Sequence, residues 1–291
     1  MKFLDGKAAM MKTGLILEGG AMRGLFTAGA MDVMMERGIP FDGVIGVSAG
    51  AAFGCNYLSG QIGRVLRYNT QFCRDKRYCG LRPLLKNGNI YSTDFCYGEV
   101  PLKLDVFDFA AFEHNPAEFY VVCTDIETGK AVYHKYTGQK DHGFDWIRAS
   151  ASMPLVSQIV EIDGQKLLDG GISDSIPVKY FEQIGYDRNV AVLTQPDDYR
   201  KSANRMLPLI RRKYRAYPKL VEALANRHLM YNEELDYIAK EESDGRLFVI
   251  RPETALPIRR VEKDPEKLRL AYQAGRDAAS SRMEALLAFL M

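Results

Sequence analysis

The pentapeptide Gly46–Gly50 is the feature that most constrains the fold, because it places Ser48 between a strand pattern and a helix pattern. The β-branched run that ends at Val47 predicts a short strand, and the small residues from Ala51 onward predict a helix. In that context Gly-x-Ser-x-Gly is typical of a nucleophile elbow, a sharp turn in which glycines avoid Cβ clashes. The N–H groups that open the helix would favour negative charge beside the serine. We therefore expect an α/β protein in which Ser48 is the candidate nucleophile.

The composition is that of a globular protein large enough for one α/β domain and an appendage. The chain has 291 residues, of which 47% are hydrophobic and 26% charged, and its net charge is +2. Its apolar runs fall short of the roughly 20 residues that a membrane-spanning helix needs. Residues 1–7 carry charges where a signal peptide would have an apolar core. From these two features we expect a cytoplasmic protein. The five cysteines form no Cys-x-x-Cys pair and have no histidine at ligand spacing, so we expect reduced thiols and no metal.

A βαβ unit is predicted around the elbow. Residues 14–18 predict a buried strand, residues 24–35 a helix, and residues 44–47 the strand that delivers Ser48. Residues 60–115 have a mixed, aromatic-rich pattern that predicts helices and loops over the site.

Two β-hairpins are predicted further along the chain. The first covers residues 119–136, and the second covers residues 159–168 around the turn Asp163–Gly164. A helix is predicted between them, over residues 144–152. Asp169 stands at the end of the second hairpin, directly before two glycines.

The pattern becomes mainly helical in the last third of the sequence. One strand is predicted at residues 247–250, and a last helix runs from Asp264 to Leu290. The predicted organisation is therefore an α/β domain over residues 12–195 and a mainly helical C-terminal extension over residues 196–291.

A serine nucleophile needs a base, and the sequence offers two candidates. An α/β-hydrolase triad would place its histidine last along the chain, where His228 stands inside a helical pattern without loop signals. Asp169 is the better candidate, because it ends a strand and because Gly170 and Gly171 remove side chains that would obstruct close approach. Burial beside the serine would make this carboxylate a stronger base than it is in water. We expect Asp169 to serve Ser48, and a triad through His228 is the competing arrangement.

The glycine-rich segment Gly19–Gly24 lies between the first predicted strand and the first predicted helix. The backbone N–H groups of Gly19, Gly20 and Ala21 could form an oxyanion hole, in which one donor is typically worth roughly 10²–10³ in rate. A dinucleotide phosphate loop is a weaker interpretation, because Ala21 stands where Gly-x-Gly-x-x-Gly requires a glycine. A loop that only packs a helix on the sheet is the third interpretation.

These motifs, in this order, resemble those of the patatin-like phospholipases. The segment Arg148–Pro154 is also similar to the helix-to-proline stretch that precedes the family's aspartate. The similarity covers roughly residues 12–195 and implies a three-layer α/β/α sandwich with a mainly parallel sheet. It implies hydrolysis of lipid acyl esters by a Ser48–Asp169 dyad, without a catalytic histidine, a metal or an organic cofactor. Residues 196–291 resemble the helical extension of a bacterial branch of the family. This part of the resemblance implies no function for the extension.

The resemblance also assigns supporting roles. It makes the amides of the glycine-rich loop the oxyanion donors, and it gives Arg23 either an anion-binding or a structural role. The chain departs from the family at Ala21, where a third glycine is usual, and alanine keeps the N–H donor but disfavours positive φ. The other supporting positions are Gly24, Gly46, Gly50, Gly170 and Gly171.

Residues 200–231 form a basic, aromatic segment in a nearly neutral chain. Apolar residues recur there at three-and-four spacing, which predicts an amphipathic helix kinked at Pro208 or Pro218. Such a helix either packs on the α/β domain or makes a peripheral contact with anionic membrane. Nucleic acid is not expected as a partner, because no recognition motif accompanies the charge.

Two functions follow from these features. The leading expectation is a serine lipid acyl hydrolase of the phospholipase A or esterase type, with lipid or other acyl esters as substrates. The alternative is a catalytically weak or silent protein of the same fold that binds lipid or a regulatory partner. Ala21 and the large extension are the features that support the alternative.

Overall fold

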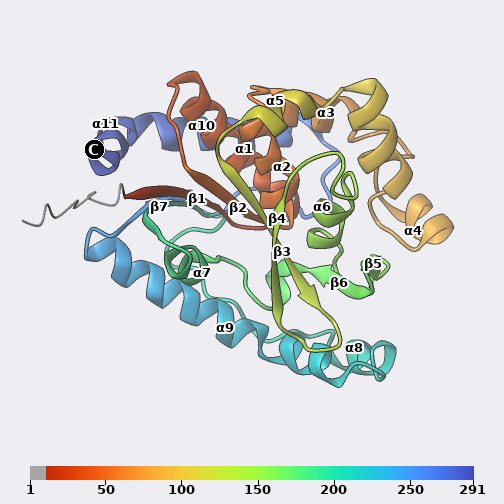
Figure 1. Cartoon of the computed structure of the whole chain (residues 1–291). Helices are drawn as coiled ribbons and strands as arrows, with labels where there is room; N and C mark the ends of the chain where they lie inside the picture. Colours follow the sequence, from red (N-terminus) through yellow and green to blue (C-terminus); the bar gives the residue numbers. More distant parts are fainter. Residues whose placement is uncertain (1–10) are drawn as a thin grey trace, which may run out of the picture.

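The computed structural model describes residues 11–291, and eight strands in it form one mixed sheet (Figure 1). The strands are β1 (Lys12–Leu17), β2 (Gly43–Val47), β3 (Glu118–Asp125), β4 (Ala131–Tyr136), β5 (Val160–Ile162), β6 (Gln165–Asp169), β7 (Tyr186–Val192) and β8 (Leu247–Ile250). Their order is β5-β6-β3-β2-β1-β7-β8, and β4 pairs with β3 beside this path. Residues 1–7, which carry the expectation about a signal peptide, lie outside the described residues.

Helices surround this sheet. The α-helices are α1 (Gly24–Glu36), α2 (Ala49–Leu58), α3 (Arg64–Phe72), α4 (Leu81–Asn87), α5 (Phe109–His114), α6 (Asp145–Ser150), α7 (Val178–Gln183), α8 (Leu207–Lys213), α9 (Pro218–Ser243), α10 (Pro265–Ser281) and α11 (Met283–Leu290). Two short 3₁₀ turns, η1 (Ala21–Arg23) and η3 (Gly170–Ile172), follow β1 and β6. A π-helical segment, η2 (Asp94–Leu104), lies between α4 and α5.

The sheet is parallel at its centre and antiparallel at one side. β1 pairs in parallel with β2 and β7, while β3 and β8 extend this parallel core on either side. β4 and β6 pair antiparallel with β3, and β5 pairs antiparallel with β6. The βαβ unit, both hairpins and the strand at 247–250 are therefore confirmed.

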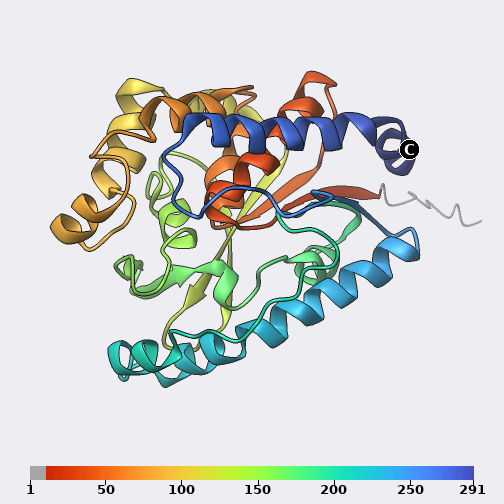
Figure 2. The same cartoon turned by 180° about the vertical axis from the view of Figure 1, so that it is seen from behind.

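Two hydrophobic cores lie on the two faces of the sheet, as parallel strands require. Leu15 and Leu17 of β1 belong to one core, whereas Ile16, which points to the opposite face, belongs to the other. In Figures 1 and 2 α1 and α10 cover the first face, and α7 and α9 cover the second. The predicted three-layer sandwich with a mainly parallel sheet is confirmed.

The residues beyond 195 continue the same sheet and the same cores. β8 adds a parallel strand beside β7, and α10 crosses α1 with their backbones in contact. A Cβ on Gly29 of α1 would lie 2.0 Å from Tyr272 O, and a Cβ on Gly275 of α10 would lie 1.9 Å from Phe26 O. Both glycines are therefore required where the two helices cross.

Two predictions about the C-terminal helices are wrong. The last helix is interrupted between α10 and α11 at Arg282, whose guanidinium reaches across to Val249 O of β8. Residues 200–231 contain two helices instead of one kinked helix. Pro208 and Pro218 lie in their first turns, where the missing N–H of proline costs no helical hydrogen bond.

The apolar side of α8 and the start of α9 packs on the sheet domain. Ile210, Tyr214 and Leu224 are buried in a third cluster together with Leu168 and Ile172. Packing therefore accounts for the apolar periodicity of this segment, while the basic side chains Arg211, Arg212 and Lys213 are exposed.

Candidate active site

Ser48 occupies the turn between β2 and α2, and its backbone is strained. Its φ of 56° and ψ of −119° lie in a positive-φ region that residues other than glycine rarely adopt. A Cβ added to Gly46 would lie 2.5 Å from Ala51 N, and one added to Gly50 would lie 2.2 Å from Leu17 O. The close approach of turn, helix and neighbouring strand therefore requires glycine at both predicted positions.

Asp169 ends β6 beside this serine. The Ser48 hydroxyl donates a hydrogen bond of 2.7 Å to Asp169 Oδ2, and the Gly171 N–H donates one of 2.9 Å to Asp169 Oδ1. Gly170 passes so close to β3 that an added Cβ would lie 2.1 Å from Val122 O. The fold thus brings the predicted serine and aspartate together, although 121 positions separate them in the chain.

The environment of Asp169 makes its carboxylate more basic. The residue is only 5% exposed, and this burial raises the pKa of the carboxyl above its ordinary value. The positive charge of Arg227 opposes the rise in pKa, as do the hydrogen bonds from Ser48 and Gly171. A carboxylate with a raised pKa accepts a proton from a hydroxyl more readily near neutral pH than an aspartate in water does.

Two serines that we did not predict hold the backbones of the pair. Ser150 Oγ accepts a hydrogen bond of 2.8 Å from the Ser48 N–H and donates one of 2.6 Å to Val122 O. The Ser152 carbonyl accepts a hydrogen bond of 2.9 Å from the Asp169 N–H. Both belong to the segment Arg148–Pro154, whose run of small residues was the sequence signal that could have located them.

The glycine-rich loop passes directly beside the serine. A Cβ on Gly19 would lie 2.9 Å from Ser48 Cβ, and a Cβ on Gly20 would lie 2.8 Å from Thr194 Oγ1. Within the part of the chain that the structure describes, the amides of Gly19 and Gly20 donate to no other protein atom. Their N–H groups are therefore available to an oxygen atom bound at this position.

Ala21 holds a backbone conformation that suits glycine. Its φ is 50°, in the left-handed region, where an L-residue is disfavoured by roughly 1–2 kcal/mol. Gly20 before it has a φ of −174°, which is extended backbone without strain. The departure from the family pattern therefore falls on the loop residue that requires positive φ.

The two residues that follow the loop have different surroundings. Gly24 lets α1 approach α2, because an added Cβ would lie 2.9 Å from Phe53 Cε2. Arg23 ends η1, and its Nε is buried without a hydrogen-bond partner among the described residues.

Glu18 anchors the start of the loop to distant parts of the chain. Its Oε2 accepts hydrogen bonds of 2.6 Å from the Thr194 N–H and 3.1 Å from the Thr194 hydroxyl. Its Oε1 accepts one of 2.6 Å from the Tyr231 hydroxyl of α9. The loop is therefore fixed by residues from both sides of position 195.

Among the described residues no histidine forms a hydrogen bond with Ser48 or Asp169. His228 Nδ1 lies 3.1 Å from Ala225 O in its own helix, and the Ser48 hydroxyl is already bonded to Asp169. The other three histidines contact Ala110 O, Asp141 and Asp163. Over residues 11–291 the structure has no cluster of three His, Cys, Asp or Glu side chains that could hold a metal ion.

A cavity of about 100 Å³ extends from Ser48 along α2. Four residues of α2, from Ala49 to Cys55, line it, and they cover about 10 Å of helix beyond the serine. Its other walls come largely from residues 60–115, as the aromatic-rich pattern predicted. The lining residues from the loop, α2 and these walls include Ala21, Met22, Ala49, Ala52, Phe53, Cys55, Tyr68, Tyr78, Tyr91, Tyr97, Val100 and Met153.

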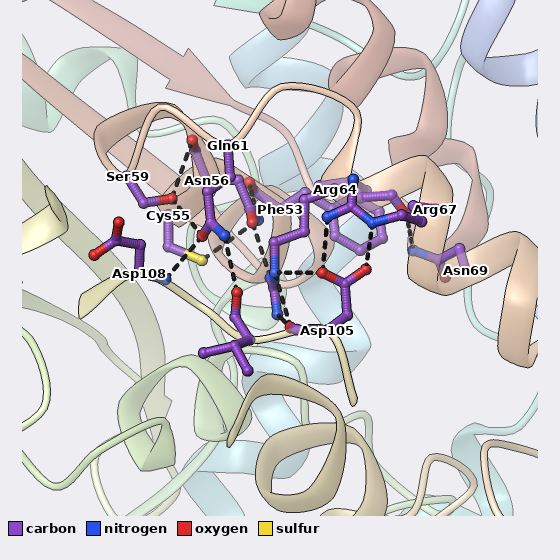
Figure 3. Close-up of polar contacts among 12 residues, drawn as sticks. Phe53, Cys55, Asn56, Ser59, Gln61, Arg64, Arg67, Asn69, Asp105 and Asp108 are labelled. Carbon is purple, nitrogen blue, oxygen red and sulfur yellow. Dashed lines mark hydrogen bonds and ion pairs between the residues drawn. The ribbon is translucent and has the colours of Figure 1, made fainter. Parts of the chain in front are cut away.

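The buried guanidinium of Arg64 forms part of the cavity wall. Figure 3 shows its polar contacts. Arg64 donates hydrogen bonds of 2.9 Å to Asn56 Oδ1 and 3.1 Å to Asp105 O, and its Nε lies 3.4 Å from Asp105 Oδ1. Arg67 binds the same carboxylate with two hydrogen bonds of 2.8 Å. This network fixes α3 and the end of η2 against α2, and it gives the cavity its shape.

Comparison with known proteins identifies the family. The sequence profile described as patatin-like phospholipase matches residues 15–182, which is more than half of the chain. The chain belongs to the patatin-like phospholipase family. A second profile, a domain of unknown function designated DUF6363, matches residues 217–291 of this patatin-like protein.

The relatives with assigned names cover different shares of the patatin-like chain. The uncharacterized protein YjjU of Escherichia coli is 28% identical over 278 residues, which are 90% of this chain and 74% of YjjU. Lysophospholipase nte1 of Aspergillus niger is 30% identical over 192 residues, 62% of this chain but 12% of that protein. Among solved structures, VipD of Legionella pneumophila aligns with a TM-score of 0.47 and 12% identity, covering 94% of this chain and 67% of VipD.

Proposed function

We propose that this chain is a serine lipid acyl hydrolase of the phospholipase A or esterase type, with a Ser48–Asp169 dyad. The hydrogen bond of 2.7 Å between the Ser48 hydroxyl and Asp169 Oδ2 is the observation that carries the proposal. The strained elbow, the loop beside it and the cavity along α2 support it. The family, and relatives named as lysophospholipases, support lipid esters as the substrate class.

In the first half of the reaction Asp169 accepts the hydroxyl proton while Ser48 Oγ attacks the ester carbonyl carbon. The carbonyl oxygen becomes an oxyanion, which the amides of Gly19, Gly20 and Ala21 and the first N–H groups of α2 stabilise. The tetrahedral intermediate then releases the alcohol, which takes the proton from Asp169. Ser48 is left as an acyl ester.

In the second half Asp169 accepts a proton from water, and the resulting hydroxide attacks the acyl ester. The second oxyanion occupies the same loop, and its collapse releases the fatty acid and returns the proton to Ser48. Because one carboxylate accepts and returns the proton in both halves, the proposed reaction needs no histidine.

Covalent labelling with a fluorophosphonate tests this assignment. We expect wild-type protein to be labelled, Ser48→Ala to be unlabelled, and Asp169→Asn to be labelled far more slowly although it folds. A turnover screen over esters and phospholipids of different chain lengths then defines the substrate. Labelling that persists in Ser48→Ala, or that is unchanged in Asp169→Asn, would contradict the dyad.

A silent lipid-binding protein is the second candidate, and the conformation of Ala21 favours it. An alanine with a φ of 50° strains the loop that must present the oxyanion donors. This candidate predicts that folded wild-type protein binds monoacyl lipids but is not labelled at Ser48. If Ala21→Gly protein is labelled at Ser48 although wild-type protein is not, the chain is an enzyme that the conformation of Ala21 weakens.

Peripheral contact with anionic membrane through residues 200–231 is part of the same proposal. Met206 and Leu209 at the start of α8 are exposed, at 50% and 48%, next to the exposed basic residues 211–213. Co-sedimentation with vesicles tests it, and binding that is equal for neutral and anionic vesicles would contradict it. A cytoplasmic location stays a prediction, and all five cysteines are free thiols.

A further inference from the structure

Four cationic side chains lie near the candidate dyad or near the residues that anchor its glycine-rich loop, and three of them come from beyond residue 195. They are Arg23, Lys201, Arg227 and Arg260. Within residues 11–291 none of the four forms an ion pair with a carboxylate, whereas Arg64, Arg246 and Arg276 do. Arg227 contacts the backbone that follows Asp169, and Lys201 contacts Tyr231, which anchors the loop beside Ser48.

Arg227 of α9 lies against the glycines that follow Asp169. Its Nε donates to Gly171 O, and its Nη2 lies 3.1 Å from the point where a Cβ of Gly171 would be. Asp169 Oδ1 lies 3.2 Å from that same point. The guanidinium and the carboxylate therefore flank one backbone position, and the absence of a side chain at Gly171 allows both to approach it.

Lys201 lies beside the residues that anchor the glycine-rich loop. Its Nζ lies 3.9 Å from the ring centroid of Tyr231, whose hydroxyl binds Glu18. Burial, together with the positive charges of Arg227, Arg23 and Arg260, lowers the pKa of this ammonium to about 8, while Glu18 opposes the fall. The positive charges of three arginines thus act on Lys201.

Arg260 and Arg23 complete the cluster from two other directions. The backbone carbonyl of Arg260 accepts a hydrogen bond of 3.0 Å from the hydroxyl of Tyr91, which lines the cavity, and the Arg260 side chain is exposed. Arg23 directly follows the loop and has a buried Nε with no partner in the described structure. A buried donor without an acceptor is costly, so an acceptor bound here would stabilise the site.

The nearby carboxylates Glu18 and Asp169 do not pair directly with these cations in the described residues. Glu18 is fully engaged by Thr194 and Tyr231, and Asp169 is engaged by Ser48 and Gly171. A group that carries several acceptor oxygens and up to two negative charges matches this arrangement of cations. Phosphate is such a group, and arginine binds it through paired N–H donors.

We propose that Lys201, Arg227 and Arg260 form a binding site for the phosphate of a phosphate-bearing acyl glycerol, next to the ester that Ser48 attacks. The lipid nature of this ligand rests on the proposed function. The site gives a role to the region matched by the domain of unknown function, because Arg227 and Arg260 lie within residues 217–291. The C-terminal part then selects the headgroup, while the cavity along α2 holds the acyl chain.

Ligand binding to a Ser48→Ala protein tests the site without requiring turnover. Calorimetry compares a monoacyl glycerol phosphate with the monoacyl glycerol of the same chain length, and inorganic phosphate serves as a third ligand. We expect the Ser48→Ala protein to bind the phosphate-bearing lipid at least tenfold more tightly than the neutral lipid. Adding Lys201→Gln and Arg260→Gln should remove this preference, since each charged contact is worth about tenfold in affinity.

Arg227 is left unchanged in this test because it also supports Gly171 O. The matched control removes two exposed cations instead, through Arg37→Gln and Lys240→Gln, and should keep the preference. Lys240 is on the same helix as Arg227 but about 20 Å further along it. If Lys201→Gln with Arg260→Gln keeps the preference, the site does not exist.

The remaining outcomes separate this inference from the proposed function. If inorganic phosphate binds through Lys201 and Arg260 but the two lipids bind equally, the cluster takes free phosphate and the substrate assignment is overturned. If the phosphate preference is present but wild-type protein hydrolyses no ester, the phosphate site stands and the proposed catalysis fails. If both lipids bind equally and inorganic phosphate does not bind, the phosphate site is overturned but the proposed hydrolase function is not.

Discussion

Replacing Ala21 with glycine should stabilise this protein, although it removes a methyl group from the wall of a cavity. The residue has a φ of 50°, which places an alanine in the left-handed region. Glycine adopts that region about as readily as any other. The substitution therefore removes strain at a position where the family pattern has glycine.

The expected gain follows from two opposing terms. Left-handed backbone disfavours an L-residue by roughly 1–2 kcal/mol. Glycine loses more conformational freedom on folding than alanine does, which offsets about 0.5–1 kcal/mol of that relief. The net increase in the free energy of unfolding should be about 0.5–1 kcal/mol, equivalent to roughly 2 °C in Tm for a chain of this size.

Urea unfolding followed by circular dichroism measures this difference. We expect the midpoint of Ala21→Gly to rise while the slope of the free energy against urea stays constant, because the surface exposed on unfolding is unchanged. A glycine elsewhere in the protein supplies the reverse substitution. Gly38 has a φ of 63°, and a Cβ there would meet no atom within 4 Å.

Gly38→Ala should therefore lose about as much stability as Ala21→Gly gains, since both exchange the same two residues in similar backbone. An unchanged or lowered midpoint for Ala21→Gly, alongside a lowered midpoint for Gly38→Ala, would refute the strain at Ala21. It would mean that the loop relaxes around alanine.

Four further substitutions and one pH–rate profile have expected outcomes. Asp169→Asn should be more stable than wild type at neutral pH, because an aspartate with a raised folded-state pKa destabilises the fold once it is ionised. The difference in Tm between the two proteins should vanish as the pH falls through 3.8, the ordinary pKa of an aspartate. The same raised pKa should shift the acidic limb of wild-type kcat/KM above that value, which a pH–rate profile measures. Asp105→Asn leaves the buried charge of Arg64 without its carboxylate and should cost about 3–5 kcal/mol in urea unfolding, whereas Asp75→Asn, at an exposed ion pair, should cost less than about 1 kcal/mol. Ser150→Ala leaves the Ser48 N–H without an acceptor and should cost about 1–3 kcal/mol, with slower fluorophosphonate labelling.

The sequence was sufficient for the parts of the site that local backbone geometry determines. The elbow at Ser48 follows from a strand pattern, a helix pattern and two glycines, and each glycine has a steric reason within a few residues. Asp169 was found because a hairpin turn sets the register of its strand and so the place where it ends. In both motifs the residues that determine the backbone geometry are close to one another in the sequence.

The remaining parts depend on contacts between segments that are distant in sequence. Ser150 supports Ser48 from 102 positions away, and Arg227 reaches Gly171 from 56 positions away. The basic pattern of residues 200–231 indicated a surface charge, but it did not distinguish Lys201 and Arg227, which turn toward the dyad, from Arg211, which faces solvent. The π-helical segment Asp94–Leu104 was also not predictable, because it contains a glycine and a proline that normally end helices.

The crossing of α1 and α10 determines when the protein can finish folding during its synthesis. Asp32 of α1 accepts a hydrogen bond of 2.6 Å from the Tyr272 hydroxyl, 240 positions later in the chain. At typical translation rates the ribosome needs on the order of ten to fifty seconds to make the residues between α1 and the end of α10. Throughout that interval β1 and the apolar side of α1 lack the covering helix α10, and for most of it Glu18 also lacks its partner Tyr231. The nascent chain therefore presents a hydrophobic surface that chaperones can bind, and it gains a complete site only after most of the polypeptide has left the ribosome.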